Sequence, residues 1–172
     1  MDKCGQCGYV YESIAAGDIP DALRALGDHY REVILDPDAE GLVKIRPTAD
    51  VWSALEYACH FRDVLLSQRD RVILALVEDM PRYARMYRDE RVFLAGYGRE
   101  PVAEVTAELP MAANLMAKLF ECLSTDQLER PCIYNYPEPS ERNVAWLGYH
   151  TLHEGTHHLD DVRSVLGQVA SG

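Results

Sequence analysis

The sequence predicts an all-α fold, a four-helix bundle with a short N-terminal arm that carries a CxxC motif. Four long segments have apolar residues at helical spacing, no segment shows a convincing strand pattern, and the connections have loop length. At 172 residues the chain is long enough to bury a core as a single domain. We expect residues 1–17 to form the arm and residues 18–172 to form an antiparallel bundle.

The four predicted helices are bounded by residues that commonly start or stop helices. Thr48 and Asn143 are suitable N-cap residues, and Asp36-Pro37 ends the first helix. Pro110 should kink or break the third helix, because a proline inside a helix removes a backbone hydrogen bond. The helices are expected at residues 19–35, 48–78, 101–123 and 143–169.

The segments between these helices carry their own expectations. Residues 81–98 are rich in Arg, Tyr and Gly and should arch over one end of the domain, with a helical turn at 82–87. Residues 125–130 should form a short helical turn. Residues 131–142 contain three prolines, so this segment should be a structured loop or a short ribbon beside the last helix.

Charge and hydropathy exclude several classes of partner. The formal net charge of -11 argues against nucleic acid and anionic membranes, because no Lys/Arg cluster offsets the repulsion. The longest apolar run, residues 72–77, is too short to span a bilayer, and the first residues lack the pattern of a signal peptide. We therefore expect a cytoplasmic protein that acts on small molecules, and a homodimer is an open possibility.

The N-terminal arm contains Cys4 and Cys7 in the sequence KCGQCGYVY, which resembles half of a rubredoxin or zinc-ribbon site. The other half is missing, because Cys59, Cys122 and Cys132 stand singly. Either the pair shares a zinc ion with distant residues, or it is a reduced pair on a flexible arm.

The last predicted helix holds four of the six histidines, and two pairs of potential metal ligands compete there. His153 and His157 are four residues apart, and so are Glu154 and His158, which places each pair on one helix face. The apolar stripe favours the second pair, because His158 lies at its flank and Glu154 a little further round. Asp161 is one turn beyond His158 and is the predicted catalytic residue, either orienting the imidazole or meeting the substrate. The stripe consists of Tyr149, Leu152, Leu159, Val162, Val165 and Leu166.

A metal centre on this helix needs a third ligand from elsewhere, because catalytic zinc usually has three protein ligands and one open position. His60 on the second predicted helix is the obvious donor, since His29 is the only other histidine outside the last helix. The predicted ligands are therefore His60, Glu154 and His158. The remaining histidines, His150, His153 and His157, are expected at the rim or in solvent.

Two motifs resemble a known family. WSALEYACH (residues 52–60) is similar to the second-helix motif of the DinB/YfiT-like metalloprotein superfamily, and HEGTHHLDDV (residues 153–162) is similar to its last-helix motif. Most relatives carry HxxxH followed by Gln, whereas Glu154, His158 and Asp161 fit the ExxxHxxD variant of the branch that resembles mycothiol-dependent maleylpyruvate isomerase. The resemblance covers residues 19–169 and implies a four-helix bundle with a divalent metal in a pocket at one end.

The resemblance also implies a chemistry. In characterised members of the family, the divalent metal, often zinc, activates a low-molecular-weight thiol such as mycothiol or bacillithiol. The thiol is then transferred to a small electrophile or used to isomerise it. Nickel, iron and manganese also suit a site of two imidazoles and one carboxylate. A dication held by these ligands keeps a net positive charge, so it can lower the pKa of a bound thiol or water. A hydrolase that uses water and a non-catalytic metal- or ligand-binding protein are the alternatives. Residues 134–136 and 82–99 are candidate contacts for the thiol or the electrophile.

Overall fold

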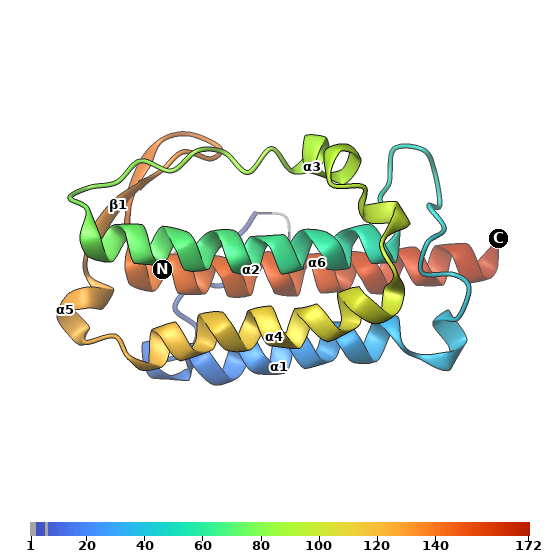
Figure 1. Ribbon diagram of the computed structural model, residues 1–172, viewed down its shortest axis with the longest axis horizontal. Helices are drawn as coiled ribbons and strands as arrows, with labels where there is room; N and C mark the ends of the chain where they lie inside the picture. Colours follow the sequence, from blue (N-terminus) through green and yellow to red (C-terminus); the bar gives the residue numbers. More distant parts are fainter. Residues whose placement is uncertain (1–2, 6) are drawn as a thin grey trace.

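The structure, a computed structural model that describes residues 3–5 and 7–172, is a four-helix bundle with a small ribbon at one end (Figure 1). Met1, Asp2 and Gln6 of the predicted arm lie outside the described residues. The long helices are α1 (Ile19–Ile34), α2 (Ala54–Val77), α4 (Val102–Glu121) and α6 (Val144–Ser171). The shorter ones are α3 (Arg88–Leu94), α5 (Thr125–Leu128), η1 (Ala16–Asp18), η2 (Pro37–Ala39) and η3 (Tyr97–Arg99).

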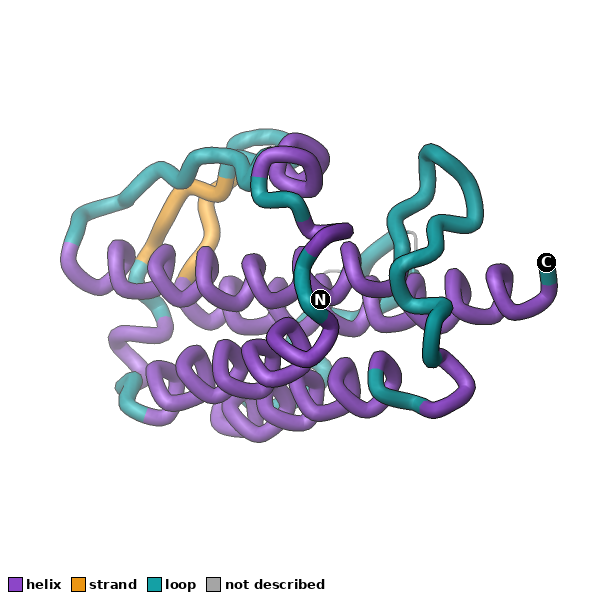
Figure 2. The backbone as a smooth tube through the Cα atoms, turned by 45° about the vertical axis from the view of Figure 1, so that its right-hand side comes forward, coloured by secondary structure: helices purple, strands orange, loops and turns teal. Residues whose placement is uncertain are grey.

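The all-α prediction needs one addition, an antiparallel ribbon of two short strands. Strand β1 (Pro131–Tyr134) pairs with β2 (Ser140–Asn143), with Cys132 opposite Arg142. The ribbon expected as one alternative for residues 131–142 is therefore confirmed. Figure 2 shows the two strands rising from one end of the bundle toward the chain that connects α2 to α4.

The helices do not all run antiparallel to their neighbours, which corrects the predicted topology. Helices α1 and α2 each pack against both α4 and α6. Two of these pairs run parallel, because Ile19 of α1 lies beside Gly148 of α6 and Arg62 of α2 pairs with Glu108 of α4. Parallel neighbours require a connection that returns along the whole bundle, and the crossover segment, residues 78–101, makes that return (Figure 1).

The crossover segment is anchored to α2 by a network of charged side chains. Asp63 accepts hydrogen bonds from the Tyr97 hydroxyl at 2.7 Å and from Arg91 at 3.0 Å, while Arg62 pairs with Glu100. The helical turn predicted at residues 82–87 is wrong. This stretch is extended because Arg82 forms a parallel bridge with Ile133, and helix α3 starts only after Tyr87, which has a left-handed backbone conformation.

Side-chain caps mark the start of two of the long helices, α2 and α6. Helix α2 starts after Ser53, not after Thr48 as predicted, because Ser53 and Glu56 form a capping box in which each side chain accepts the other's backbone N–H. Asn143 caps α6 as predicted, accepting a hydrogen bond from the backbone N–H of Trp146 at 2.9 Å. Helix α4 continues through Pro110, so no break occurs there.

The main core lies between the four long helices, and a second layer of chain covers the outer face of α2 and α6. Tyr30 stacks on Phe61 in the centre, with ring centroids 4.6 Å apart, and donates a hydrogen bond to the Gly155 carbonyl. The arm buries Tyr11 against α6, where it stacks on Trp146. Among the described residues, none of the helices is long and apolar enough to cross a membrane.

Candidate metal centre

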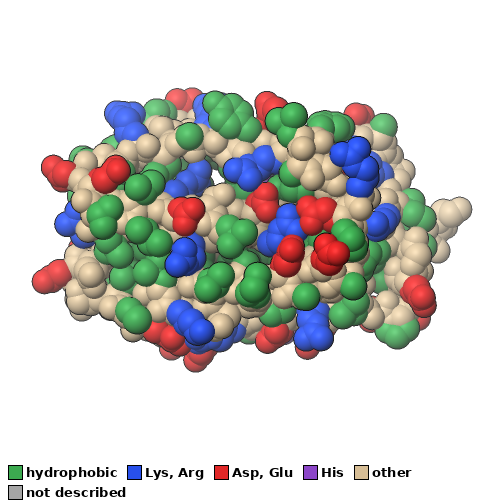
Figure 3. Space-filling view, in the orientation of Figure 1, with side chains coloured by type: hydrophobic (Ala, Val, Ile, Leu, Met, Phe, Trp, Pro, Cys, Tyr) green, Lys and Arg blue, Asp and Glu red, His purple; other side chains and the backbone are tan. Residues whose placement is uncertain are grey.

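A large cavity lies between the α2–α6 face and the segments that cover it. It has a volume of about 1070 Å³ and is walled by the arm, α2, the crossover segment, the loop of the ribbon and α6. Figure 3 shows an opening between the crossover segment and the bundle, with basic side chains beside it. A smaller cavity of about 400 Å³ near Glu12 and Glu129 contains none of the histidines.

His60 faces this cavity with two unused ring nitrogens. Its side chain is 2% exposed, and neither nitrogen has a hydrogen-bond partner among the described residues. Burial, followed by the neighbouring His158 and by Arg88, lowers the pKa of His60 to about 3. The imidazole is therefore neutral at pH 7, the form that binds metal ions. An unpartnered buried nitrogen is costly, so a ligand on this ring would remove a penalty.

His158 and Glu154 lie beside His60, as the sequence predicted. The rings of His60 and His158 meet edge to face with centroids 5.0 Å apart. One nitrogen of each ring and one Glu154 carboxylate oxygen all lie within 4.8 Å of one another. Folding thus brings His60 together with Glu154 and His158, which lie nearly a hundred residues later in the sequence, and the donor set suits a divalent cation.

Asp161 contacts the other side of the His158 ring. Its Oδ2 lies 2.9 Å from His158 Nδ1, while His158 Nε2 lies 3.8 Å from the Glu154 carboxylate. A carboxylate at Nδ1 holds the proton there and leaves the Nε2 lone pair for a metal ion. Asp161 is therefore placed to orient the His158 ring, which is one of the two roles expected for it from the sequence.

The expectation that His150 and His153 lie at the rim or in solvent is wrong. They are 9% and 8% exposed because the arm and the ribbon cover this side of α6. The Tyr11 hydroxyl lies 2.9 Å from His150 Nδ1 and 3.0 Å from His153 Nδ1. The helical wheel of this helix identified only the face that packs in the bundle core. It missed the other face of α6, which the arm and the ribbon bury. His157 is half-buried in the cavity wall, closer to the expected rim position.

Two neighbouring combinations of side chains also bring potential ligand atoms together. One combines His150, His153 and Glu154, and the other combines His157, His158 and Asp161. Both nitrogens of His150 are already used, since Nε2 lies 3.1 Å from the Tyr134 hydroxyl. In the second combination, His158 Nδ1 is engaged by Asp161. The set with His60 is the one in which the free nitrogens and the carboxylate converge.

Charged side chains of both signs line the cavity, and the acidic ones besides Glu154 are Asp89, Glu90 and Glu138. Arg71, Arg85, Arg88 and Arg142 line the cavity, together with the loop around Asn135. Parts of both segments proposed as substrate contacts, residues 84–90 and 134–136, lie in its wall. Such a lining suits a polar ligand, and its arginines can pair with an anionic group on that ligand.

The comparisons with known proteins agree with this fold. The sequence model of the DinB superfamily matches residues 14–162. The solved structure of YfiT from Bacillus subtilis, described as "a probable metal-dependent hydrolase with an unusual four-helix bundle topology", superimposes with a TM-score of 0.77 and 15% sequence identity. The match covers 91% of this chain and 90% of that chain. No protein with a curated description matches the sequence. The chain belongs to the DinB superfamily.

Proposed function

We propose that this protein is a divalent-metal-dependent enzyme with His60, Glu154 and His158 as the ligands, most simply of zinc. The observation that carries the proposal is the His60 ring, which is buried with both nitrogens unpartnered and has one nitrogen within 4.8 Å of the Glu154 and His158 ligand atoms. A divalent cation there would act as a Lewis acid and lower the pKa of a small nucleophile. Three protein ligands leave a position for that nucleophile.

Each neighbouring residue has a role that follows from its contacts. Asp161 orients His158 through Nδ1, so it is a positioning residue in this proposal. Trp52 packs on His60 with ring centroids 5.3 Å apart and fixes the plane of that ring. The arginines that line the cavity bind and orient the polar body of the substrate, and the covering segments limit the access of bulk water to the ligands.

The preferred nucleophile is a low-molecular-weight thiol, transferred to or used to isomerise a small electrophile. A cavity of about 1070 Å³ has room for two small molecules together. The arginines that line the cavity suit a thiol that carries anionic or polar groups. The ExxxHxxD pattern of Glu154, His158 and Asp161 resembles the thiol-dependent branch of the family and supports the same choice.

Hydrolysis with water as the nucleophile is the second candidate. The likeness in fold to YfiT, which is described as a probable metal-dependent hydrolase, favours it. Both candidates use the same ligands and differ in whether a thiol binds beside the metal ion.

Metal content of purified variants tests the site. His60→Ala and His158→Ala should each lose the metal ion of this centre, whereas His29→Ala, at an exposed position on α1, should keep it. Elemental analysis after dialysis against zinc measures the difference. Unchanged metal content in both ligand variants would overturn the proposal.

Calorimetric titration with thiols separates the two candidates. The zinc-loaded protein should bind a low-molecular-weight thiol, and His158→Ala should abolish that binding. Absence of binding across a panel of such thiols, together with turnover of ester or amide substrates, would replace thiol transfer with hydrolysis.

A further inference from the structure

The described residues of the CxxC arm, 3–5 and 7–10, fold back into a turn above α6. The backbone N–H of Cys4 donates to the Tyr9 carbonyl at 2.8 Å, and the N–H of Gly8 donates to the Cys4 carbonyl at 3.0 Å. Gly8 has a φ of 76°, a conformation that glycine adopts without strain. Lys3 and Val10 close the turn as an antiparallel bridge. This turn brings the two sulfur atoms close together, the arrangement that one metal ion requires of two cysteines.

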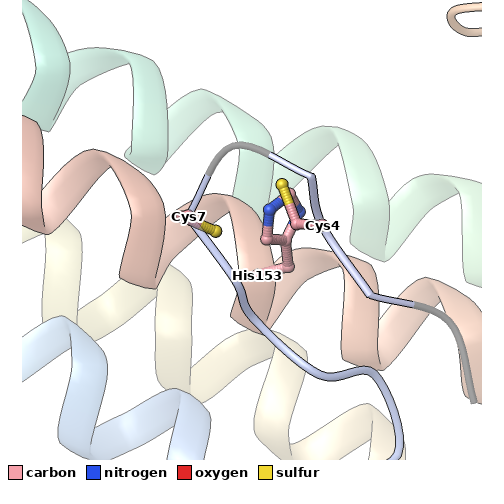
Figure 4. A group of neighbouring side chains, drawn as sticks. All are labelled: Cys4, Cys7 and His153. Carbon is pink, nitrogen blue, oxygen red and sulfur yellow. The ribbon is translucent and has the colours of Figure 1, made fainter.

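His153 of α6 supplies a third potential ligand atom below the turn. The Cys4 and Cys7 sulfur atoms and one ring nitrogen of His153 all lie within 4.8 Å of one another (Figure 4). The Nδ1 atom lies 3.0 Å from the Tyr11 hydroxyl, which leaves Nε2 for a metal ion. This Nε2 is buried and has no hydrogen-bond partner among the described residues, while the His153 side chain is nine-tenths buried.

We propose that Cys4, Cys7 and His153 form a second metal site, which holds Zn²⁺. Two thiolates and one imidazole are a typical donor set for zinc, and a water molecule or a small ligand completes the tetrahedron. Binding converts both thiols to thiolates and releases their protons to solvent. Tyr11 holds the His153 ring through Nδ1, in the way that outer contacts orient metal-bound histidines.

The two sites use different atoms, so this site does not depend on the proposed function. Glu154 contributes to the set with His60 and His158, whereas the neighbouring His153 contributes to the set on the arm. The sites nevertheless share one cavity, because Lys3, Cys4, Gly5 and Tyr11 form part of its wall. A zinc ion on Cys4, Cys7 and His153 would fasten the arm to α6 and fix that wall.

Cobalt substitution under reducing conditions tests this site directly. Co²⁺ bound to thiolates produces a charge-transfer band in the near ultraviolet, which a site of imidazoles and carboxylates lacks. The reduced full-length protein should show this band and bind one more equivalent of Co²⁺ than Cys4→Ser or Cys7→Ser. Both cysteine variants should lose the band. Cys122→Ser, at an exposed cysteine elsewhere in the chain, should keep it.

Three further variants separate the ligands from their surroundings. His60→Ala should keep the band, whatever it does to the other metal centre. His153→Ala should weaken Co²⁺ binding at the cysteines, whereas Tyr11→Phe, which keeps His153 Nε2, should retain the band. Absence of the band in the reduced wild-type protein would overturn the site. An unchanged Co²⁺ affinity of this band in a folded His153→Ala variant would also overturn it.

Discussion

Asp161 holds His158 in one orientation, with Oδ2 of the carboxylate 2.9 Å from Nδ1 of the ring. The two residues are three positions apart on α6, so the contact is made within one helical turn and needs no other element. It leaves His158 Nε2 directed toward Glu154, at 3.8 Å. One helix thus supplies two potential ligands and the residue that orients one of them.

Replacing Asp161 should therefore weaken metal binding without removing a ligand. Asp161→Asn is expected to lower zinc affinity at the His60 site by roughly 10- to 100-fold, because the ring loses its charged partner. Competition with a chromophoric chelator measures this change. Asp160→Asn is the matched control, since Asp160 is exposed and pairs only weakly with Arg163. Equal losses in the two variants would show that overall charge, and not the contact with His158, is responsible.

Gly155 allows α6 to approach α2 closely, and alanine at this position should destabilise the bundle. A Cβ there would lie 2.5 Å from the Phe61 ring and would also collide with Leu26. Gly155→Ala should reduce the free energy of unfolding by about 1–3 kcal/mol, measured by urea denaturation. Gly167→Ala on the same helix has open space around it and should be neutral or stabilising by up to about 1 kcal/mol. Wild-type stability of Gly155→Ala would show that the helices can separate at no cost.

The sequence predicted that His60, Glu154 and His158 lie together, from helical spacing on the last helix and from the scarcity of other histidines. The spacing of Glu154, His158 and Asp161 and the apolar stripe of the same helix selected one face of α6. The structure places His60 opposite that face. Helix boundaries were predictable where a single residue caps the helix, as at Asn143, and wrong where a capping box operates further along, as at Ser53.

The second covered face of α6 was not predictable from that helix alone. His150 and His153 are polar and lie away from the bundle core, so helical periodicity assigns them to solvent. They are buried because Tyr11, nearly 140 residues earlier in the chain, packs over them. The parallel arrangement of α2 and α4 was missed for a similar reason, since it depends on the path of the crossover segment.

Tyr11 should contribute substantially to the attachment of the arm. Its hydroxyl is the partner of both His150 Nδ1 and His153 Nδ1. Tyr11→Phe leaves these buried nitrogens without that partner and should lower the free energy of unfolding by about 1–3 kcal/mol. Tyr136→Phe, at an exposed tyrosine, should have no effect. Chemical denaturation of the two variants at neutral pH makes the comparison, and equal stabilities would exclude the hydroxyl as an anchor.

Glu56 should make the stability of α2 depend on pH. Burial raises the pKa of this carboxyl, but hydrogen bonds from Arg46 at 2.7 and 2.8 Å and from the Ser53 N–H at 2.8 Å outweigh it, so the pKa is lowered. A lowered pKa in the folded state stabilises the protein above the unfolded-state pKa of about 4.3. This stabilisation is lost as the pH falls through the folded-state pKa.

Glu56→Gln removes the charge but keeps the shape of the side chain. At pH 7 it should reduce the free energy of unfolding by about 1.5–3 kcal/mol, because hydrogen bonds to a charged group are lost. Denaturation at a series of pH values should show this difference shrinking as the pH falls below the unfolded-state pKa and through the lowered pKa of the wild-type carboxyl. Glu32→Gln, at an exposed position on α1, should match the wild type throughout the series. A difference that persists undiminished in acid would assign the loss to packing of the glutamine and not to the ion pair with Arg46.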